Sequence, residues 1–262
     1  MSFLIALLIV IAERMAWNLD THRNQAWLQL LDSRLQTFSL FKKPLATPYG
    51  RAALLVGLPV ALVLFIQVLL HDAWLLEIPF YAAALWFSLG PNDLGREIEA
   101  ALAKHRQHAT DGRGDFRPIM QRAFTGANDA LLAPLFWFAL LGPVGAFTYR
   151  WYAQWMDDEY SSDNSLLSTA WTYINWIPVR LTLLCFAIAG NFDAVAAAWK
   201  NTETEEADIS SSSELLASAG IAALEQTAPR SHSEIDVEDA MALVWRSLTL
   251  WMALYALISM ID

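Results

Sequence analysis

The residues of this chain best suited to chemistry are charged side chains inside or beside long apolar stretches. The clearest is Arg180, which closes the run Trp176-Ile-Pro178-Val-Arg180. A charge in hydrocarbon is costly unless it faces a polar interior or a partner. Pro178 lacks a backbone N–H, so it leaves a carbonyl of the preceding turn available to line a cavity. We predict that these residues bind an anionic or carboxylate ligand; the alternative is a structural ion pair of Arg180 with Glu77 or Asp129.

Further charged residues stand at the ends of apolar stretches. Glu13 and Arg14 follow the first such stretch, and Arg150 follows Tyr149 directly. Each has two interpretations, because long polar side chains near a membrane boundary often only anchor the helix at the headgroups. The alternative is that they form the rim of a polar cavity.

Standard catalytic and metal-binding motifs do not occur in the sequence. No nucleophile elbow, zinc-protease motif, phosphate loop or cysteine pair is present. The single cysteine, Cys185, excludes an internal disulfide and a four-cysteine metal site. A net charge of −10 argues against nucleic-acid binding. We therefore predict no catalytic residue, no metal ligand and no nucleic-acid partner.

The elements that must position these residues are membrane helices. Hydrophobic residues make up 56% and charged residues 17% of the chain, whereas globular domains have about 45–50% and about 25%. A spanning helix needs about 20 apolar residues. We predict an all-α, polytopic helical membrane protein that forms one membrane domain over residues 1–262. The predicted spans are residues 2–17, 52–70, 73–90, 131–149, 171–189, which we expect to be kinked or re-entrant at Pro178, and 241–261.

The distribution of basic residues predicts the orientation of these spans. Most of the 17 Lys and Arg lie within residues 13–51 and 91–130, which the positive-inside rule makes cytoplasmic. Both regions contain predicted amphipathic helices, at residues 22–40 and from about 92 to 108. Because the predicted span 131–149 starts on the cytoplasmic side and crosses the membrane once, residues 150–170 are expected to lie outside. Residues 190–240 are cytoplasmic if 171–189 spans the membrane and external if it does not.

Two long motifs resemble a known family. The first runs from Leu132-Ala-Pro-Leu-Phe-Trp137 through Leu141-Gly-Pro-Val-Gly-Ala146 to Tyr149-Arg150, and the second is Asn175-Trp-Ile-Pro-Val-Arg-Leu181. Both resemble the AmpE family of inner-membrane proteins and its larger relatives, the CobD/CbiB cobinamide synthases. The AmpE resemblance implies a multi-pass inner-membrane protein that modulates peptidoglycan recycling and β-lactamase induction, with a functional link to an AmpD-type amidase.

The resemblance to the synthases implies a different activity. CobD/CbiB proteins attach an aminopropanol arm to a corrin carboxyl in an ATP-requiring amide-bond formation. On this alternative, Mg²⁺ and ATP lie near Asp93, Glu97 and Asp129. The sequence keeps Asp129, but Thr125 and Gly126 replace the Glu-Asn pair of the synthases. Because carboxylates and amides would hold the metal and the nucleophile, we favour a non-enzymatic regulatory protein without a cofactor.

These arguments define one set of candidate ligand-binding residues and a short set of partners. The residues are Arg180, Pro178, Trp176, Asp129, Arg150, Glu13, Arg14, Asp93 and Glu97. Membrane lipid is the expected partner, and whether the chain forms a homo-oligomer is left open. A transporter is the least favoured alternative, because only one broken helix is found and transporters usually pair two.

Overall fold

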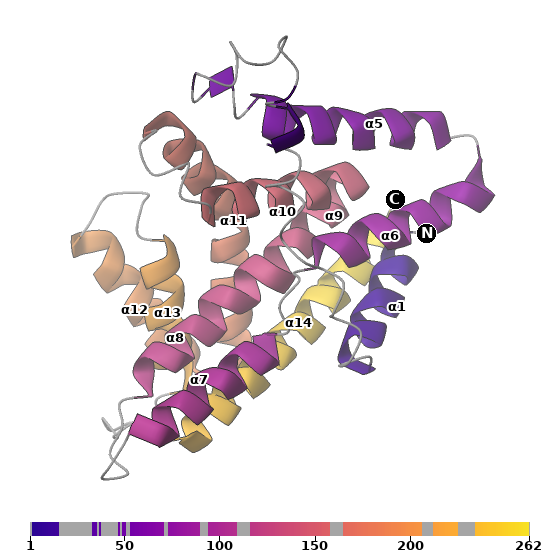
Figure 1. Ribbon diagram of the computed structural model, residues 1–262. Helices are drawn as coiled ribbons and strands as arrows, with labels where there is room; N and C mark the ends of the chain where they lie inside the picture. The colour runs from indigo at the N-terminus through magenta and orange to yellow at the C-terminus, as the bar shows by residue number, and fades with distance from the viewer. Residues whose placement is uncertain are drawn as a thin grey trace. The chain divides into compact units, whose positions relative to one another are not determined.

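The computed structural model describes residues 2–15, 33–35, 37, 47, 49–50, 53–70, 73–89, 94–108, 116–157, 165–205, 212–224 and 234–261 (Figure 1). The residues it describes form helices and no strand. Four stretches are long and apolar enough to cross a membrane, judged by length and composition: Ala53–Leu70, Arg117–Leu141, Thr169–Ala189 and Val237–Leu257. The prediction of an all-α, polytopic helical membrane protein is confirmed.

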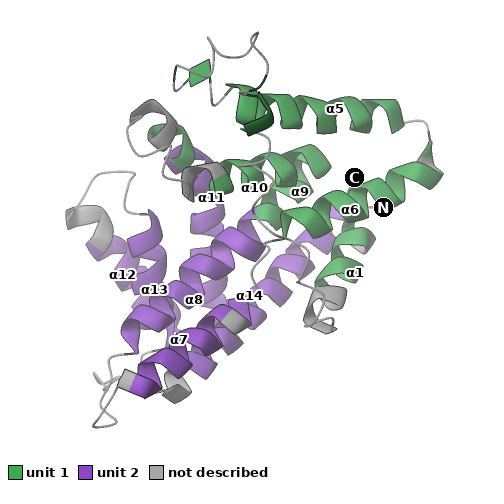
Figure 2. Ribbon diagram, in the orientation of Figure 1, with its two compact units in different colours: residues 1–91, 134–171 green, residues 92–133, 172–262 purple. Residues whose placement is uncertain are grey.

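The helices form two compact units, each built from two separate parts of the chain (Figure 2). Unit 1 comprises residues 1–91 and 134–171, and unit 2 comprises residues 92–133 and 172–262.

Unit 1 contains α1 (Ser2–Met15), the π-helix η2 (Ala53–Gly57), α5 (Leu58–Leu70), α6 (Trp74–Ser88), nearly all of α9 (Ala133–Leu141) and α10 (Pro143–Asp157). Unit 2 contains α7 (Leu94–His108), α8 (Arg117–Ala127), the π-helix η3 (Asn128–Leu132), α12 (Phe192–Glu205), α13 (Ser212–Leu224) and α14 (Glu234–Ile261). Helix α11 (Ser165–Ala189) begins in unit 1 and continues in unit 2 from Thr172. The single membrane domain over residues 1–262 stays a prediction.

In unit 1 the chain reverses direction at Gly142, inside the predicted span 131–149. Gly142 has a φ of +67°, in the left-handed region that favours glycine. A Cβ at Gly145 would collide with the carbonyl oxygen of Trp137, so the first turn of α10 packs directly against α9. The stretch 131–149 therefore contains the end of one helix, the turn and the start of another. The absence of charge in this run predicts one span, because hydropathy does not detect a turn at a glycine.

Helix α10 then runs antiparallel to α5. Gly142 lies beside Gln67, in the last turn of α5, and the Trp151 indole donates a hydrogen bond to the carbonyl of Leu55 in η2. Trp151 of α10 thus lies at the end of unit 1 where η2 begins. The external placement of residues 150–170 stays a prediction.

Two other predicted spans are short helices in unit 1. Helix α6 has 15 residues and α1 has 14, or roughly 22 Å and 21 Å at 1.5 Å per residue. The hydrocarbon core is about 30 Å thick. The helices cover residues 2–15 and 74–88 of the predicted spans 2–17 and 73–90, and residues 16, 17 and 90 lie outside the described residues. The predicted amphipathic helix at 22–40 lies outside the described residues except for 33–35 and 37.

Unit 2 is a helical bundle with one apolar core, to which α7, α8, α11, α12, α13 and α14 all contribute. Helices α8 and α11 are antiparallel: the ring centroids of Phe124 and Phe186 lie 5.2 Å apart, and Thr182 hydrogen-bonds Asn128, the first residue of η3, one turn after Phe124. The end of α11 therefore lies beside the start of α8.

Helices α12 and α13 belong to that same end of unit 2. The N–H of Asn191 donates to the carbonyl of Ala223 at 3.2 Å, and Arg246 donates to the carbonyl of Ala189 at 3.3 Å. Within unit 2, the start of α12 and the end of α13 thus lie beside the C-terminal end of α11. Whether 171–189 spans the membrane, and so on which side residues 190–240 lie, stays a prediction.

Candidate functional site

Helix α11 continues through Pro178 without a break, and it carries Trp176 and Arg180 one turn apart. The guanidinium carbon of Arg180 lies 4.0 Å from the centroid of the Trp176 ring. One guanidinium nitrogen donates to the Trp176 carbonyl at 3.4 Å. A cation over an indole face is attracted by the ring quadrupole. The arginine is therefore held along its own helix, on an indole that is 40% exposed.

A buried group of polar side chains joins α11 to the junction of α8 and η3. The Thr182 hydroxyl lies 2.9 Å from the carbonyl of Pro178 and 3.2 Å from Oδ1 of Asn128. Nδ2 of Asn128 donates to Oδ1 of Asp129 at 2.9 Å. We call Asn128, Asp129, Pro178 and Thr182 the α8–α11 polar cluster. Asn128 and Thr182 are almost fully buried, so the hydrogen bond between them is stronger than it would be at a surface.

The cluster coincides with two local irregularities in its helices. Asn128 begins the π-helix η3, in which the N–H of Ala133 donates to the Asn128 carbonyl. On the other helix, the Thr182 hydroxyl reaches the carbonyl of Pro178, the residue that cannot donate to the helix ladder. Short π-helices inside α-helices occur frequently at functional sites. A position beside such an irregular helix is thus typical of a functional site, and less typical of regular helix packing.

Thr182 is a residue of α11 that contacts Asn128. Thr182 and Arg180 are two positions apart, which is about 200° around an α-helix. Glu77, the other partner considered for Arg180, belongs to α6 of unit 1. The contacts given above for Arg180 are those with Trp176, and an ion pair of Arg180 with Glu77 or Asp129 stays a prediction.

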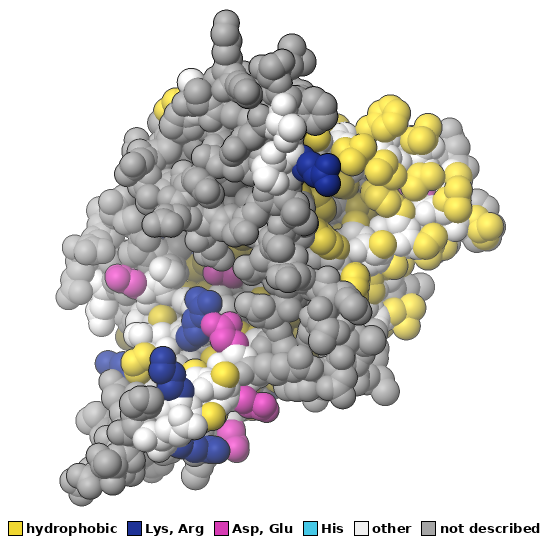
Figure 3. Space-filling model, in the orientation of Figure 1, with side chains coloured by type: hydrophobic (Ala, Val, Ile, Leu, Met, Phe, Trp, Pro, Cys, Tyr) yellow, Lys and Arg dark blue, Asp and Glu magenta, His cyan; other side chains and the backbone are white. Residues whose placement is uncertain are grey.

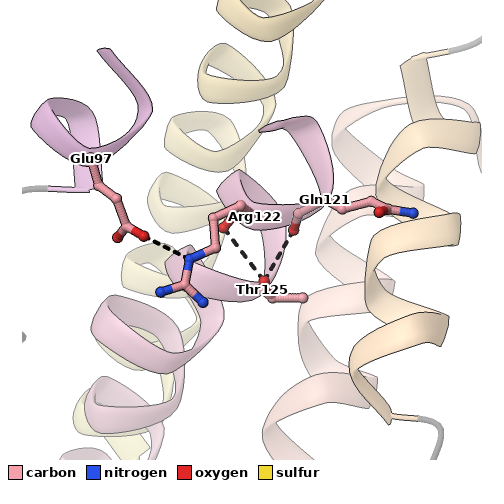
Figure 4. Close-up of polar contacts among 4 residues, drawn as sticks. All are labelled: Glu97, Gln121, Arg122 and Thr125. Atoms are coloured by element: carbon pink, nitrogen blue, oxygen red, sulfur yellow. Dashed lines mark hydrogen bonds and ion pairs between the residues drawn. The ribbon is translucent and has the colours of Figure 1, made fainter. Parts of the chain in front are cut away.

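A second polar contact links α7 to α8 on the surface of unit 2 (Figure 4). Nε of Arg122 donates to Oε1 of Glu97 at 2.7 Å, and the two side chains are 62% and 34% exposed. Thr125, one turn further along α8, bonds to the carbonyls of Gln121 and Arg122 in its own helix. An exposed pair of this kind contributes little to stability. Among the described residues, no three His, Cys, Asp or Glu side chains lie close enough to hold a metal ion.

The other predicted site residues are spread over the chain. Arg150 lies in α10 of unit 1, where it is half-buried. The helical backbone of α1 includes Glu13 and Arg14. Asp93 lies outside the described residues. The binding roles of all these residues stay predictions.

Two residues that the sequence reasoning missed are Asn128 and Thr182. A signal for each was present, because both are polar residues in apolar stretches and Thr182 follows a helical proline by four positions. A threonine hydroxyl often bonds the carbonyl four residues earlier. What the sequence does not reveal is that the two side chains meet.

Comparison with known proteins gives one informative relationship. The chain is similar to the cobalamin biosynthesis protein CobD of Chromobacterium violaceum, with 28% identity over 156 residues. The alignment covers 50% of this chain and 49% of CobD, so the chain spans about half the length of the curated relative it matches. No protein-family model matches the chain, and no solved structure matches it. The protein is thus a membrane protein with distant homology to CobD.

Proposed function

We propose that this chain is an AmpE-like regulatory protein of the inner membrane, linked to peptidoglycan recycling and β-lactamase induction, and that Arg180 binds its anionic ligand. The observation that carries the proposal is the stacked Arg180–Trp176 pair on a helix of membrane length. An ionisable residue within such a helix is a functional-site candidate because its retention is costly.

The chemistry of the pair suits a carboxylate or a phosphate. A guanidinium is planar and always charged, and it can present two parallel N–H groups to an anion. Stacking on Trp176 orients that plane before a ligand arrives, which reduces the conformational entropy lost on binding. Fragments of peptidoglycan carry free carboxylates, so they belong to the ligand class that this site would accept.

The positions that depart from the synthase pattern support a regulatory role over catalysis. The Thr125 hydroxyl bonds to its own helix, and a Cβ at Gly126 would lie 2.7 Å from Cδ1 of Leu94. Neither position supplies the carboxylate or the amide that a metal-dependent ligation would need. The two motifs that resemble AmpE form the α9–α10 reversal and the middle of α11.

The test is complementation in the bacterium that encodes the chain. A deletion strain receives the wild-type chain, R180A, R180K or the control K200A, which removes an exposed basic side chain from α12. β-Lactamase activity is measured after exposure to a β-lactam, and membrane levels of each variant are measured by immunoblot. We expect R180A to lose the response, R180K to keep part of it and K200A to behave as wild type. Normal induction with R180A at wild-type abundance would disprove the proposal.

The similarity to CobD favours one second candidate, a membrane enzyme that forms an amide bond from another carboxylate with ATP and Mg²⁺. Asp129, oriented by Asn128, is the residue most suited to hold the metal. Ligand that binds only the folded state raises the melting temperature. This candidate predicts a higher melting temperature with millimolar ATP and Mg²⁺, and loss of that shift in D129N. No shift in the wild-type protein would exclude it.

A further inference from the structure

The exposed side chains of α14 change in character at Arg246, which is itself exposed. Before Arg246, the described side chains that are exposed are Glu238 and Asp239. After it, the exposed side chains are Thr249, Ala253, Leu254, Leu257 and Met260. Charged side chains are costly in hydrocarbon. This pattern is therefore typical of a helix that lies in water over its first part and in lipid over the rest.

Arg246 also contacts the end of α11. One of its guanidinium nitrogens donates to the carbonyl of Ala189 at 3.3 Å. Ala189 is the last residue of α11 and of the membrane-length stretch Thr169–Ala189. At about 1.5 Å per residue, the 21 residues of that stretch extend roughly 31 Å, and the hydrocarbon core is about 30 Å thick. The lipid-exposed parts of α11 and α14 thus end at the same level.

The surface of α11 is apolar up to this level. Its exposed large side chains in unit 2 are Tyr173, Trp176, Ile177, Leu184 and Ile188. Helix α12 begins three residues after Ala189 with the exposed ring of Phe192, and it then exposes the charged side chains of Asp193 and Lys200. Charge thus returns to the surface within about one turn of Ala189.

Helix α7 and the start of α8 also expose charged side chains. Because α8 runs antiparallel to α11 and Phe124 contacts Phe186, the part of α8 level with Ala189 lies about one turn before Phe124. Helix α7 packs beside this part of α8, where Glu97 bonds Arg122. The exposed charged residues here are Glu99, Lys104, Arg106, Arg117 and Arg122. Figure 3 shows charged side chains gathered over α7 and α8, so this end of unit 2 suits water and headgroups.

We propose that unit 2 crosses the headgroup level of the membrane at Arg246 and Ala189, and that the Arg246 guanidinium binds a phospholipid phosphate there. A guanidinium has five N–H donors in a planar fork, so the bond to the Ala189 carbonyl leaves others for a phosphate. The acyl chains lie along the exposed apolar side chains of α11 and α14. The residues of α14 before Arg246 lie outside the hydrocarbon, although hydropathy extends its membrane-length stretch back to Val237. The proposal does not depend on the function proposed for Arg180.

The first experiment measures where lipid covers the two helices. Cys185 is the single cysteine of the chain and is buried, so C185A is the background for single-cysteine variants of the full chain. E238C, A253C and I177C place a thiol at positions that the protein itself leaves exposed, so slow labelling there indicates cover by lipid. Maleimides react with the thiolate, which forms in water and not in hydrocarbon.

In open membrane fragments, we expect E238C to react with a maleimide at least tenfold faster than A253C and I177C. After denaturation in sodium dodecyl sulfate, the three rates should agree within about threefold. Equal rates for E238C and A253C in membranes would overturn the proposal, because Arg246 would then not mark a boundary.

The second experiment tests the phosphate contact by native mass spectrometry of the detergent-solubilised full chain. The probes are phosphatidylglycerol and the diacylglycerol with the same acyl chains, which lacks the phosphate. We expect R246Q to bind phosphatidylglycerol at least fivefold more weakly than the wild type and to bind diacylglycerol equally well. R246K should keep part of the phosphatidylglycerol binding.

Matched controls separate this contact from general effects. R106Q makes the same change in an exposed residue of α7 and should bind both lipids as the wild type does. If R246Q lowers the yield of folded protein, R246K is compared with R106K instead. Unchanged binding of phosphatidylglycerol by R246Q would overturn the proposal. Displacement of the lipid by millimolar inorganic phosphate would also overturn it, because the site would then bind a soluble anion.

Discussion

Gly142 and Pro178 both stand in apolar stretches of membrane length, but the helix ends at Gly142 and continues through Pro178. At Gly142 the backbone takes a left-handed conformation, and α10 folds back against α9. At Pro178 the helix runs on for 25 residues in all, from Ser165 to Ala189. Proline is the stronger helix breaker by intrinsic propensity, so propensity alone would have ranked the two positions in the opposite order.

The difference lies in what each position gains from its surroundings. Around Pro178, the Thr182 hydroxyl and the Arg180 guanidinium bond carbonyls of their own helix, and Thr182 also contacts Asn128. They do not replace the bond that proline removes, which would have been to the Ile174 carbonyl, but they hold α11 on both sides of Pro178. Around Gly142, the absence of a side chain at Gly145 allows a close approach of two helices that no larger residue permits. Neighbouring residues, rather than the breaker itself, decide whether the helix ends.

The largest effect is expected from G145L. The new side chain would meet the Trp137 carbonyl and Cβ of Leu141, which are parts of a packed hairpin and cannot move far. We expect a loss of more than about 3 kcal/mol of unfolding free energy, or failure to fold. Fluorescence-detected size exclusion and thermal melts in detergent measure this. G57L is the matched control, because nothing lies within 4 Å of a Cβ there, and a G145L variant as stable as G57L would contradict the reversal.

The next largest effect is expected from T182V, which keeps the shape of the side chain and removes its hydroxyl. The Asn128 amide oxygen would lose a buried partner, at a cost of about 1–3 kcal/mol. T182S should retain most of the stability. In the double variant T182V/N128L the two losses should not add, because they remove the same bond. Additive losses in thermal melts would show that the bond does not join α8 to α11.

A smaller effect is expected from G142A. A left-handed φ costs an L-residue about 1–2 kcal/mol, while the space around the Cβ position is sufficient. G142N should cost less, because asparagine tolerates this conformation. The melting temperatures should therefore rank wild type, G142N, G142A. A G142A variant as stable as the wild type would mean that the turn does not need glycine.

The smallest effect is expected from R122Q, which removes the exposed pair with Glu97. Such pairs contribute about 0–1 kcal/mol, and salt screens them. We expect a small fall in melting temperature at low salt that disappears near 1 M salt. A large fall in melting temperature that does not depend on salt would show that the pair stabilises the packing of α7 on α8 more than its exposure suggests.

The sequence predicted some elements well and missed others for identifiable reasons. Residues 52–70 have no charge and no interruption, so composition alone located that membrane-length helix within one residue of Ala53. The stretch 131–149 is equally free of charge, but hydropathy does not register a left-handed glycine or a close helix approach. Helix α12 was not predicted, because its first turns are rich in alanine and its end is acidic. For the candidate site, Arg180 and Pro178 were visible as anomalies in an apolar run, whereas the pairing of Thr182 with Asn128 was not.

By itself, the sequence determined that this is a helical membrane protein with a few costly polar residues, because the distribution of apolar side chains along the chain controls partition into lipid. Only the tertiary structure decided which apolar runs reverse and which residues meet. Gly142 became a turn because Gly145 admits a neighbouring helix. Asn128 and Thr182, 54 positions apart, became a pair because α8 and α11 pack antiparallel. Contacts between distant segments depend on packing geometry, which no local pattern of residues records.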